Sequence, residues 1–231
     1  MASSFAGFPA DTFTFLRELR RNNNREWFQD NKPRYQQQVV EPMGEFINAM
    51  APRLAKISTA FVADARPNGG SMFRIYRDTR FARDKSPYKT NVGCQFRHVA
   101  GKDAHAPGFY VHLEPDNVFF GGGLWLPPSQ VLFHVRTAIA EKHQQWQRIT
   151  HQKKLLDRFG GLGGTSLQRV PRGFSADHPC AEDLKRKSYV LMQQVDESVV
   201  CSPGFVGEVE RSFKTLSDFM QFLTTANGLA Y

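Results

Sequence analysis

The chain has 231 residues, 41% of them hydrophobic and 13% aromatic, which is enough apolar material for a substantial core and excludes a disordered protein. Its net charge of +8 permits nucleic acid, phosphorylated metabolites or an anionic membrane surface as partners, but charge alone describes only solubility and steering. The amino terminus lacks the basic start and apolar run of a secretion signal, and no apolar run approaches the roughly 18 residues that span a bilayer. We therefore expect a soluble, cytoplasmic protein without a membrane partner.

Cysteine usage argues against two kinds of site. Cys94, Cys180 and Cys201 are an odd number, lie far apart and form no C-x-x-C pair. Neither a disulfide framework nor a cysteine zinc site is therefore supported. Three unreactive thiols are expected.

The first part of the chain, up to about residue 58, is predicted to be helical. Apolar side chains recur at helical spacing from Asp11, which we interpret as an N-cap, until a run of asparagines ends the first helix. A second helical region, over about residues 25–54, is predicted to consist of two segments because Pro33 interrupts it.

The character of the chain changes at Asn68-Gly69-Gly70, a strong turn signal. Four short segments after it are rich in aromatic and β-branched residues and are predicted to be strands, over residues 71–77, 91–99, 108–114 and 117–120. The last two are separated by so short a connection that a hairpin is favoured, whereas parallel strands need longer crossovers. A central, mainly antiparallel sheet over about residues 71–121 is therefore expected.

Residues 127–225 are predicted to be mostly helical. The glycine run 121–123 is interpreted as a tight exit from the sheet, because it lacks the glycine spacing of phosphate and dinucleotide loops. Helices are predicted over residues 131–140, 144–159, 182–192 and 205–223, with a long loop over residues 160–179. The expected fold class is α+β, with the sheet flanked by N-terminal helices (11–58) and C-terminal helices (127–225) in one domain spanning residues 1–231.

Residues 68–98 are the most informative stretch for function. They contain seven cations and two carboxylates, a net charge of +5 out of the +8 of the whole chain. Arginine offers forked donors to phosphate or carboxylate, and aromatic rings among these cations can wall a site. The stretch therefore predicts an anion-binding site, whose candidate ligand contacts are Arg74, Arg77, Arg80, Lys85, Tyr88 and Lys89.

A structural interpretation of the same cations remains open. Asp78, Asp84 and Glu114 could pair with them and fasten the loop to the sheet. The excess of cations favours a ligand, whereas the neighbouring carboxylates offer partners within the protein. A second basic run, residues 185–187, is interpreted as a solvated helix face, and it would enlarge a basic cleft if the fold brought it toward the first.

Candidate acid-base groups lie on a predicted strand. His112 and Glu114 are two residues apart and therefore share one face of the sheet, and Asp84 is a third candidate. His98, at the end of a neighbouring strand, could join the first two around a metal ion. Because no metal-ligand spacing supports that arrangement, no metal site is predicted.

Several motifs carry a resemblance to a known family. They are NNNREWF and NKPRY, then GGSMFRIYRDTRF, DKSPYKTNVG, PGFYVHLEP, FFGGGLW, PRGF, DHP and DLKRK. Together they resemble the conserved hypothetical proteins called domain of unknown function 2461, almost from end to end. The resemblance implies a cytoplasmic, single-domain α+β protein, and it brings no activity, substrate or catalytic residue with it.

Three functions are compatible with the sequence. The favoured one is a domain that binds a small anionic ligand, bearing phosphate or carboxylate, through residues 74–89, with or without catalysis of a reaction. The second is a nucleic-acid-binding module in which Tyr76, Phe81 or Tyr88 stack on bases, and the third is a non-enzymatic interaction domain. The sequence identifies no cofactor, reaction class or oligomeric state.

Overall fold

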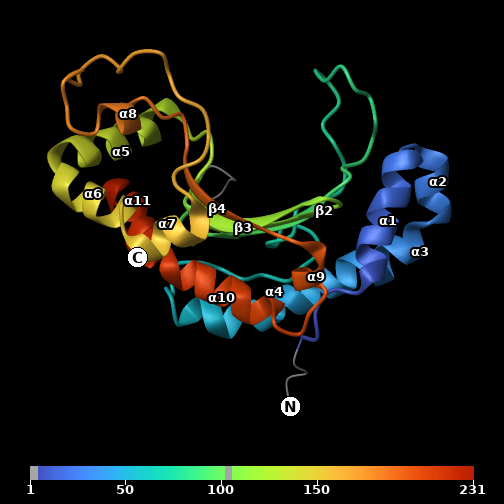
Figure 1. Ribbon diagram of the computed structural model, residues 1–231. Helices are drawn as coiled ribbons and strands as arrows, with labels where there is room; N and C mark the ends of the chain where they lie inside the picture. The colour runs from blue at the N-terminus through green and yellow to red at the C-terminus, as the bar shows by residue number, and fades with distance from the viewer. Residues whose placement is uncertain (1–4, 102–105) are drawn as a thin grey trace.

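The computed structural model describes residues 5–101 and 106–231. Within these residues an antiparallel sheet of four strands, in the order β1-β2-β3-β4, lies between helices that precede and follow it in the chain (Figure 1). The strands are β1 (Val92–Arg97), β2 (Gly108–Glu114), β3 (Asn117–Leu124) and β4 (Tyr189–Val195). The predicted α+β class with a mainly antiparallel sheet is confirmed.

Two predictions about the strands are wrong. Residues 71–77 form no regular strand, since isolated bridges from Met72 to Cys94 and from Tyr76 to Tyr88 are the pairing they make. The fourth strand is β4, which begins inside the segment 182–192 predicted to be helical and continues beyond it to Val195. The first three residues of β4 are all buried, so they lack the alternation by which a half-buried strand is recognised.

The glycine run 121–123 belongs to β3 instead of leading out of the sheet. A Cβ atom on Gly121 would lie 1.9 Å from the carbonyl oxygen of Leu191, and one on Gly123 would lie 2.0 Å from that of Tyr189. Glycine is therefore required for the backbone of β4 to pair with β3 at this distance. The prediction of a tight exit is wrong because it did not include the strand that needs these glycines.

The N-terminal helices are α1 (Ala10–Arg21), α2 (Arg25–Asp30), α3 (Lys32–Tyr35), the π-helical turn η1 (Gln36–Val40) and α4 (Glu41–Ala55). The predicted interruption near Pro33 is confirmed, because α2 ends just before it. Asp11 lies inside the first turn of α1, and Pro9 occupies the cap position. The predicted N-cap is therefore wrong, although a carboxylate in the first turn still suits the positive end of the helix.

The C-terminal helices are α5 (Ser129–Glu141), α6 (His143–Thr150), α7 (Lys153–Phe159), α8 (Ala181–Leu184), α9 (Glu197–Val200), α10 (Phe205–Thr215) and α11 (Ser217–Ala226). The predicted helix 131–140 corresponds to α5. Each of the two longer predicted helices is divided, the first into α6 and α7 and the second into α10 and α11. Among the described residues, no helix combines the length and the apolar character needed to cross a membrane.

The two faces of the sheet differ. Helices α4 and α10 cover one face (Figure 1), where Phe109 stacks on Phe213 at 4.5 Å and Phe120 meets Phe205 at 5.8 Å. These rings are fully buried, which stabilises the fold by about 1.5–3 kcal/mol per side chain. Beside the other face rise the arm (residues 73–89) and, across from it, α5 to α8 with the loop that precedes β4 (Figure 1).

Candidate functional site

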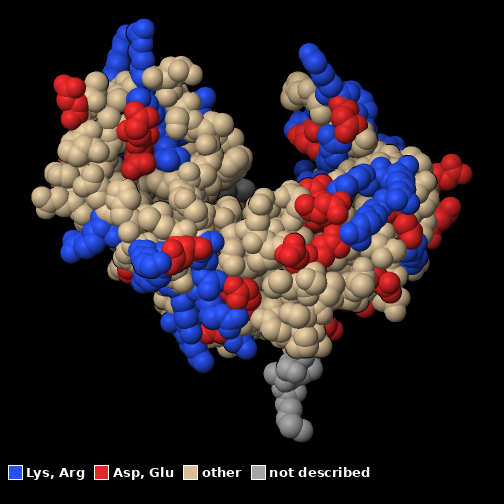
Figure 2. All heavy atoms as spheres, viewed as in Figure 1, with Lys and Arg blue, Asp and Glu red and all other residues tan. Residues whose placement is uncertain are grey.

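A cleft lies over the sheet face that α4 and α10 do not cover. Figure 2 shows a hollow between the arm and the opposite wall (residues 160–188), with largely uncharged surface at its base. The cavity there has a volume of about 800 Å³. Six rings contribute to its lining: Phe73, Tyr110, His112, Phe119, Trp125 and Phe159.

Alternation along the strands decides which side chains form the floor of this cleft. In the sheet register, His112 of β2 pairs with Phe119 of β3, which pairs with Gln194 of β4. In the next row Tyr110 pairs with Gly121, and beyond it two further glycines pair with each other. One side of the floor therefore carries polar and aromatic groups, while the glycine side is bare and lets a ligand approach the backbone.

The polar part of the floor is a series of three hydrogen-bonded side chains along β2, Tyr110, His112 and Glu114. The hydroxyl of Tyr110 lies 2.9 Å from Nδ1 of His112, and Nε2 of His112 lies 3.3 Å from a carboxylate oxygen of Glu114. A carboxylate only accepts, so Nε2 carries the proton and Nδ1 accepts from the tyrosine hydroxyl. The imidazole also stacks on Phe119, with 4.5 Å between the ring centres and 11° between the planes.

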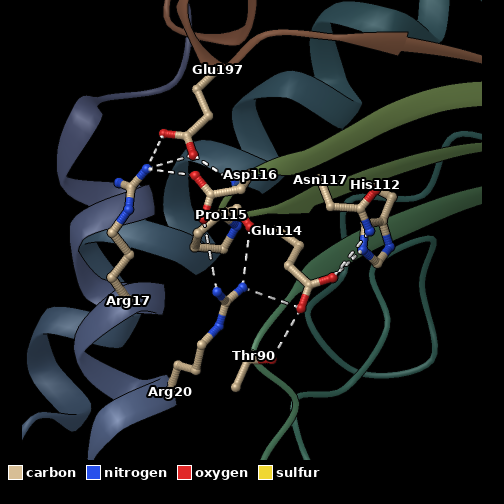
Figure 3. Close-up of polar contacts among 9 residues, drawn as sticks. All are labelled: Arg17, Arg20, Thr90, His112, Glu114, Pro115, Asp116, Asn117 and Glu197. Carbon is tan, nitrogen blue, oxygen red and sulfur yellow. Dashed lines mark hydrogen bonds and ion pairs between the residues drawn. The ribbon is translucent and has the colours of Figure 1, made fainter.

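Glu114 is also fixed by contacts with residues outside this series (Figure 3). Its carboxylate accepts hydrogen bonds from Thr90 at 3.2 Å and from Asn117 at 3.2 Å, and it forms an ion pair with Arg20 at 3.5 Å. Arg20 comes from α1 and also donates to the carbonyl oxygen of Pro115 at 3.1 Å. The N-terminal helix therefore helps to hold the carboxylate that faces His112.

The surroundings set the protonation states of Tyr110, His112 and Glu114. Burial lowers the pKa of His112 and outweighs the raising influence of Glu114. Burial acts to raise the pKa of Glu114, but hydrogen bonds from Asn117 and His112 prevail, so that its pKa is lowered. Burial raises the pKa of Tyr110. At neutral pH Tyr110 is therefore a neutral phenol, His112 a neutral imidazole and Glu114 a carboxylate.

A second cavity, of about 430 Å³, adjoins the cleft at the base of the arm. It shares Phe73 and Tyr110 with the larger cavity, and the rest of its lining is Arg77, Asp78, Lys89 and Asn91. The ammonium group of Lys89 donates to the backbone carbonyl of Arg74 at 2.9 Å. Burial and, to a lesser extent, the charge of Arg74 lower the pKa of Lys89. Two of the six candidate ligand contacts thus border a cavity that reaches the floor of the cleft.

Other candidate ligand contacts are engaged within the arm itself. Arg80 forms an ion pair with Asp78 at 2.7 Å, which lowers the pKa of that carboxyl to about 2. Lys85 donates to the carbonyl oxygen of Thr79 at 2.9 Å. Both side chains are exposed. Asp78 and Asp84 therefore pair with cations of the arm, as the structural interpretation expects, whereas the ion pair of Glu114 is with Arg20 of α1 and not with the arm.

Tyr88 and Asp84 lie apart from the cleft floor. Tyr88 is buried and stacks on Phe28 of α2 at 4.1 Å, so it packs in the core. Asp84, on the arm, accepts hydrogen bonds from Ser86 and forms an ion pair with Arg77. These contacts, those from Ser86 first, lower its pKa. The structure brings His112 and Glu114 together but does not place Asp84 with them.

The second basic run lies on the opposite wall of the cleft. Lys185 pairs with Glu182 at 2.6 Å and Arg186 with Asp183 at 3.0 Å. The prediction of a solvated helix face is wrong, because α8 ends at Leu184 and the side chains of Lys185 and Arg186 are mostly buried. The arm holds six cations and two carboxylates, and the opposite wall holds five and three. The two walls therefore carry a net charge of +6 out of +8.

The alternative in which His98 joins His112 and Glu114 does not form. Nε2 of His98 lies 2.7 Å from the carbonyl oxygen of Ala230, and its ring packs against Phe61. Among the residues that the structure describes, no group of three His, Cys, Asp or Glu side chains is placed to hold a metal ion.

Sequence reasoning did not identify Tyr110, Phe119 or Gln194 as site residues. The pattern Tyr110-x-His112-x-Glu114 repeats with the period of a strand, so Tyr110 was identifiable once His112 was considered. Phe119 carries no titratable group that would mark it, and Gln194 lies just beyond the predicted helix 182–192, where no strand was predicted. No sequence signal indicates that Arg20 of α1 reaches Glu114.

Comparison with known proteins places the chain in a family. The model of the conserved hypothetical proteins DUF2461 matches residues 11–222. The chain belongs to this family, as its motifs indicated. No curated protein matches the chain, and no solved structure does.

Proposed function

We propose, for this member of the DUF2461 family, that the cleft binds a small ligand with an anionic group at one end and an apolar, flat body at the other. The observation that carries the proposal is the junction of two unlike cavities. The larger is lined mainly by rings and bare backbone, and both share Phe73 and Tyr110. The smaller is bordered by Arg77 and Lys89 and by Asp78, whose carboxylate is paired with Arg80. A single ligand of moderate size can occupy both, because ligand sites commonly combine an apolar cavity with a few polar groups.

The anionic end would contact Lys89. Its ammonium group has three donors, of which the carbonyl oxygen of Arg74 engages one. Burial already disfavours the charged form, so a bound phosphate or carboxylate would compensate a cost that the free protein bears. Arg77 lies beside it and keeps donors beyond those used by Asp84 and the carbonyl of Ser86.

The flat body would lie over the floor. Phe119 and Trp125 line the larger cavity, and the glycine side of the floor lets an aromatic or aliphatic group approach the backbone. Apolar area removed from water there contributes about 25 cal/mol per Å² before the costs of association.

Single-stranded nucleic acid is the second candidate, supported by the charge of the walls. The arm and the opposite wall carry net charges of +4 and +2 on either side of an aromatic floor. Single-strand binders combine such cations with rings on which bases stack. This candidate requires affinity that falls steeply with salt and increases with oligonucleotide length.

Thermal shift with matched probes tests the proposal, because a ligand that binds only the folded state raises the melting temperature. Phenyl phosphate carries both parts of the proposed ligand, inorganic phosphate only the anion, and benzyl alcohol only the ring. We expect the largest shift with phenyl phosphate and its loss in Lys89→Ala. Lys85→Ala is the matched control, because Lys85 also contacts a backbone carbonyl at 2.9 Å but does not line either cavity.

Three results would contradict the small-ligand proposal. No shift with aryl phosphates or aryl carboxylates would favour an interaction domain, in which the cations have a structural or docking role. If Lys89→Ala and Lys85→Ala reduce the melting-temperature shift with phenyl phosphate equally, Lys89 is not the specific contact of the anionic group. A salt-sensitive shift with oligonucleotides alone would move the second candidate to first place.

A further inference from the structure

We infer that the floor of the cleft is a catalytic site, in which Tyr110 is the reacting group, His112 takes its proton and Glu114 holds the imidazole. This inference uses the cleft of the proposed function and adds a reaction to it. It rests on a geometric arrangement, a hydroxyl, an imidazole and a carboxylate linked in series at 2.9 Å and 3.3 Å. A weakly acidic hydroxyl becomes a nucleophile or base when an oriented imidazole accepts its proton.

The far end of the series is anchored. Thr90, Asn117 and Arg20 all contact the carboxylate of Glu114 (Figure 3), while its remaining partner is His112. A carboxylate held in this way fixes the tautomer of the imidazole and stabilises the imidazolium once it has taken a proton. An exposed His-Glu pair with no other role would not require contacts from three separate parts of the chain.

The near end is positioned by a glycine. A Cβ atom on Gly93 of β1 would lie 2.7 Å from the hydroxyl oxygen of Tyr110 and 3.2 Å from its ring. Gly93 pairs with His112 in the sheet, so the absence of a side chain there lets the phenol lie across β1 and reach the imidazole. We assign Gly93 as a positioning residue.

The step is balanced without a cofactor. The hydroxyl oxygen of Tyr110 takes a proton from a water molecule, while the oxygen of that water forms a bond to the acyl or phosphoryl centre of the bound ester. At the same time the original proton of Tyr110 passes to Nδ1 of His112, and the charge that develops on the imidazole is stabilised by Glu114. The bond between that centre and the ester oxygen then breaks, and the imidazolium returns the proton through Tyr110 to the leaving oxygen.

The position of Tyr110 restricts the substrate class. Tyr110 lines both cavities, so it faces the part of a ligand that lies between an anionic group beside Lys89 and an apolar body over Phe119. The acyl or phosphoryl centre that the activated water attacks therefore lies between these two parts. Small anionic esters with an aryl or alkyl group are the class that fits.

Labelling with benzenesulfonyl fluoride tests the relay without knowledge of the substrate. The phenol oxygen forms a bond to sulfur, fluoride leaves, and the proton of Tyr110 goes to His112. We expect Tyr110 to react faster than Tyr76, although Tyr76 is half exposed. A general base typically contributes at least about 100-fold to such a step, so His112→Gln should slow labelling of Tyr110 by about that factor. Peptide mapping by mass spectrometry measures both rates.

Matched variants separate the relay from a structural effect. His134→Gln, at an exposed position on α5, should leave the rate unchanged. Gly93→Ala should slow labelling while all three relay side chains remain, and Glu114→Gln provides a second test if His112→Gln unfolds. The inference is overturned if Tyr110 reacts no faster than Tyr76, or if its rate is the same in the folded His112→Gln or Glu114→Gln protein as in the wild type.

The relay and the anion site are separate hypotheses, and different results would contradict each. The carboxylate analogue 4-(fluorosulfonyl)benzoic acid carries the anionic group of the proposed ligand, whereas benzenesulfonyl fluoride does not. If only the proposed function is wrong, both reagents label Tyr110 at similar rates and both depend on His112. If only the relay is wrong, phenyl phosphate still raises the melting temperature and Tyr110 is not labelled preferentially.

Discussion

The floor of the cleft and the arm beside it use polar residues in opposite ways. The arm carries +4 of the chain's net charge of +8, yet Arg80, Asp78 and Asp84 have their partners within the arm. The floor holds few ionisable groups, but Tyr110, His112 and Glu114 are connected in series over a buried sheet and anchored from α1. The comparison shows that charge density along a sequence identifies a region, whereas the sheet determines which side chains converge.

The largest effect is expected from the glycines beneath the floor. Gly121→Val would place its Cβ atom 1.9 Å from the carbonyl oxygen of Leu191, so β4 must move away from β3. We expect the free energy of unfolding to fall by about 3 kcal/mol or more, measured by urea denaturation. Gly44→Ala is the control, because no atom lies within 4 Å of a Cβ there; a similar loss in that variant would contradict the close approach of β4.

A smaller effect distinguishes the base of the arm from its tip. Tyr88→Ala removes a buried ring that stacks on Phe28 and should cost about 3 kcal/mol of stability. Arg80→Ala removes an exposed ion pair with Asp78, and we expect no measurable change in melting temperature because such pairs are screened by solvent. Comparable destabilisation by both variants would mean that the arm is fastened by its charges.

The next prediction concerns pH. Labelling of Tyr110 requires neutral His112, whose pKa burial lowers below its ordinary 6.5. The groups that face it are Tyr110 and Glu114 on β2, with Arg20 of α1 behind the carboxylate. The rate should therefore remain constant as the pH falls through 6.5 and decline only at lower pH. Glu114→Gln removes an influence that raises this pKa, so the decline should move to still lower pH.

Titration of the His112 ring by NMR gives the same pKa independently. A ring that gains its proton above pH 6.5 in the folded wild-type protein would contradict the assignment of a neutral, buried imidazole.

The smallest effect is expected at Arg20. Its side chain is about 44% exposed and lies 3.5 Å from Glu114, so Arg20→Gln should cost less than about 1 kcal/mol of stability. Labelling of Tyr110 should slow by a few fold only, because Thr90 and Asn117 still hold the carboxylate. Arg21→Gln, which removes the neighbouring exposed arginine of α1, is the control. A rate loss as large as that of His112→Gln would make Arg20 part of the relay itself.

Local sequence patterns predicted the parts of the fold that depend on neighbours in the chain. The hairpin of β2 and β3 and the helices α1 and α5 follow from short turns and helical periodicity. The pairing of β4 with β3 joins residues about 70 positions apart, and nothing near β4 distinguishes its apolar run from a buried helix. The glycines 121–123 were visible, but their role depends on that distant strand.

Part of the candidate site could likewise be predicted from local sequence patterns. His112 and Glu114 were brought together by the period of one strand, and Lys89 was found as part of the basic stretch. Tertiary structure decides where the other candidate residues lie. The ring of Tyr88 packs in the core, Asp84 pairs within the arm, and Arg20 reaches Glu114 from α1.

Titration of labelled protein with phenyl phosphate, followed by two-dimensional NMR, tests most directly whether the cleft or the tip of the arm binds the ligand. The predicted result is a set of shift changes at Tyr110, His112, Phe119 and Lys89, with little change over residues 79–86. Shift changes confined to residues 79–86, with the floor unaffected, would contradict the assignment of the cleft as the functional site.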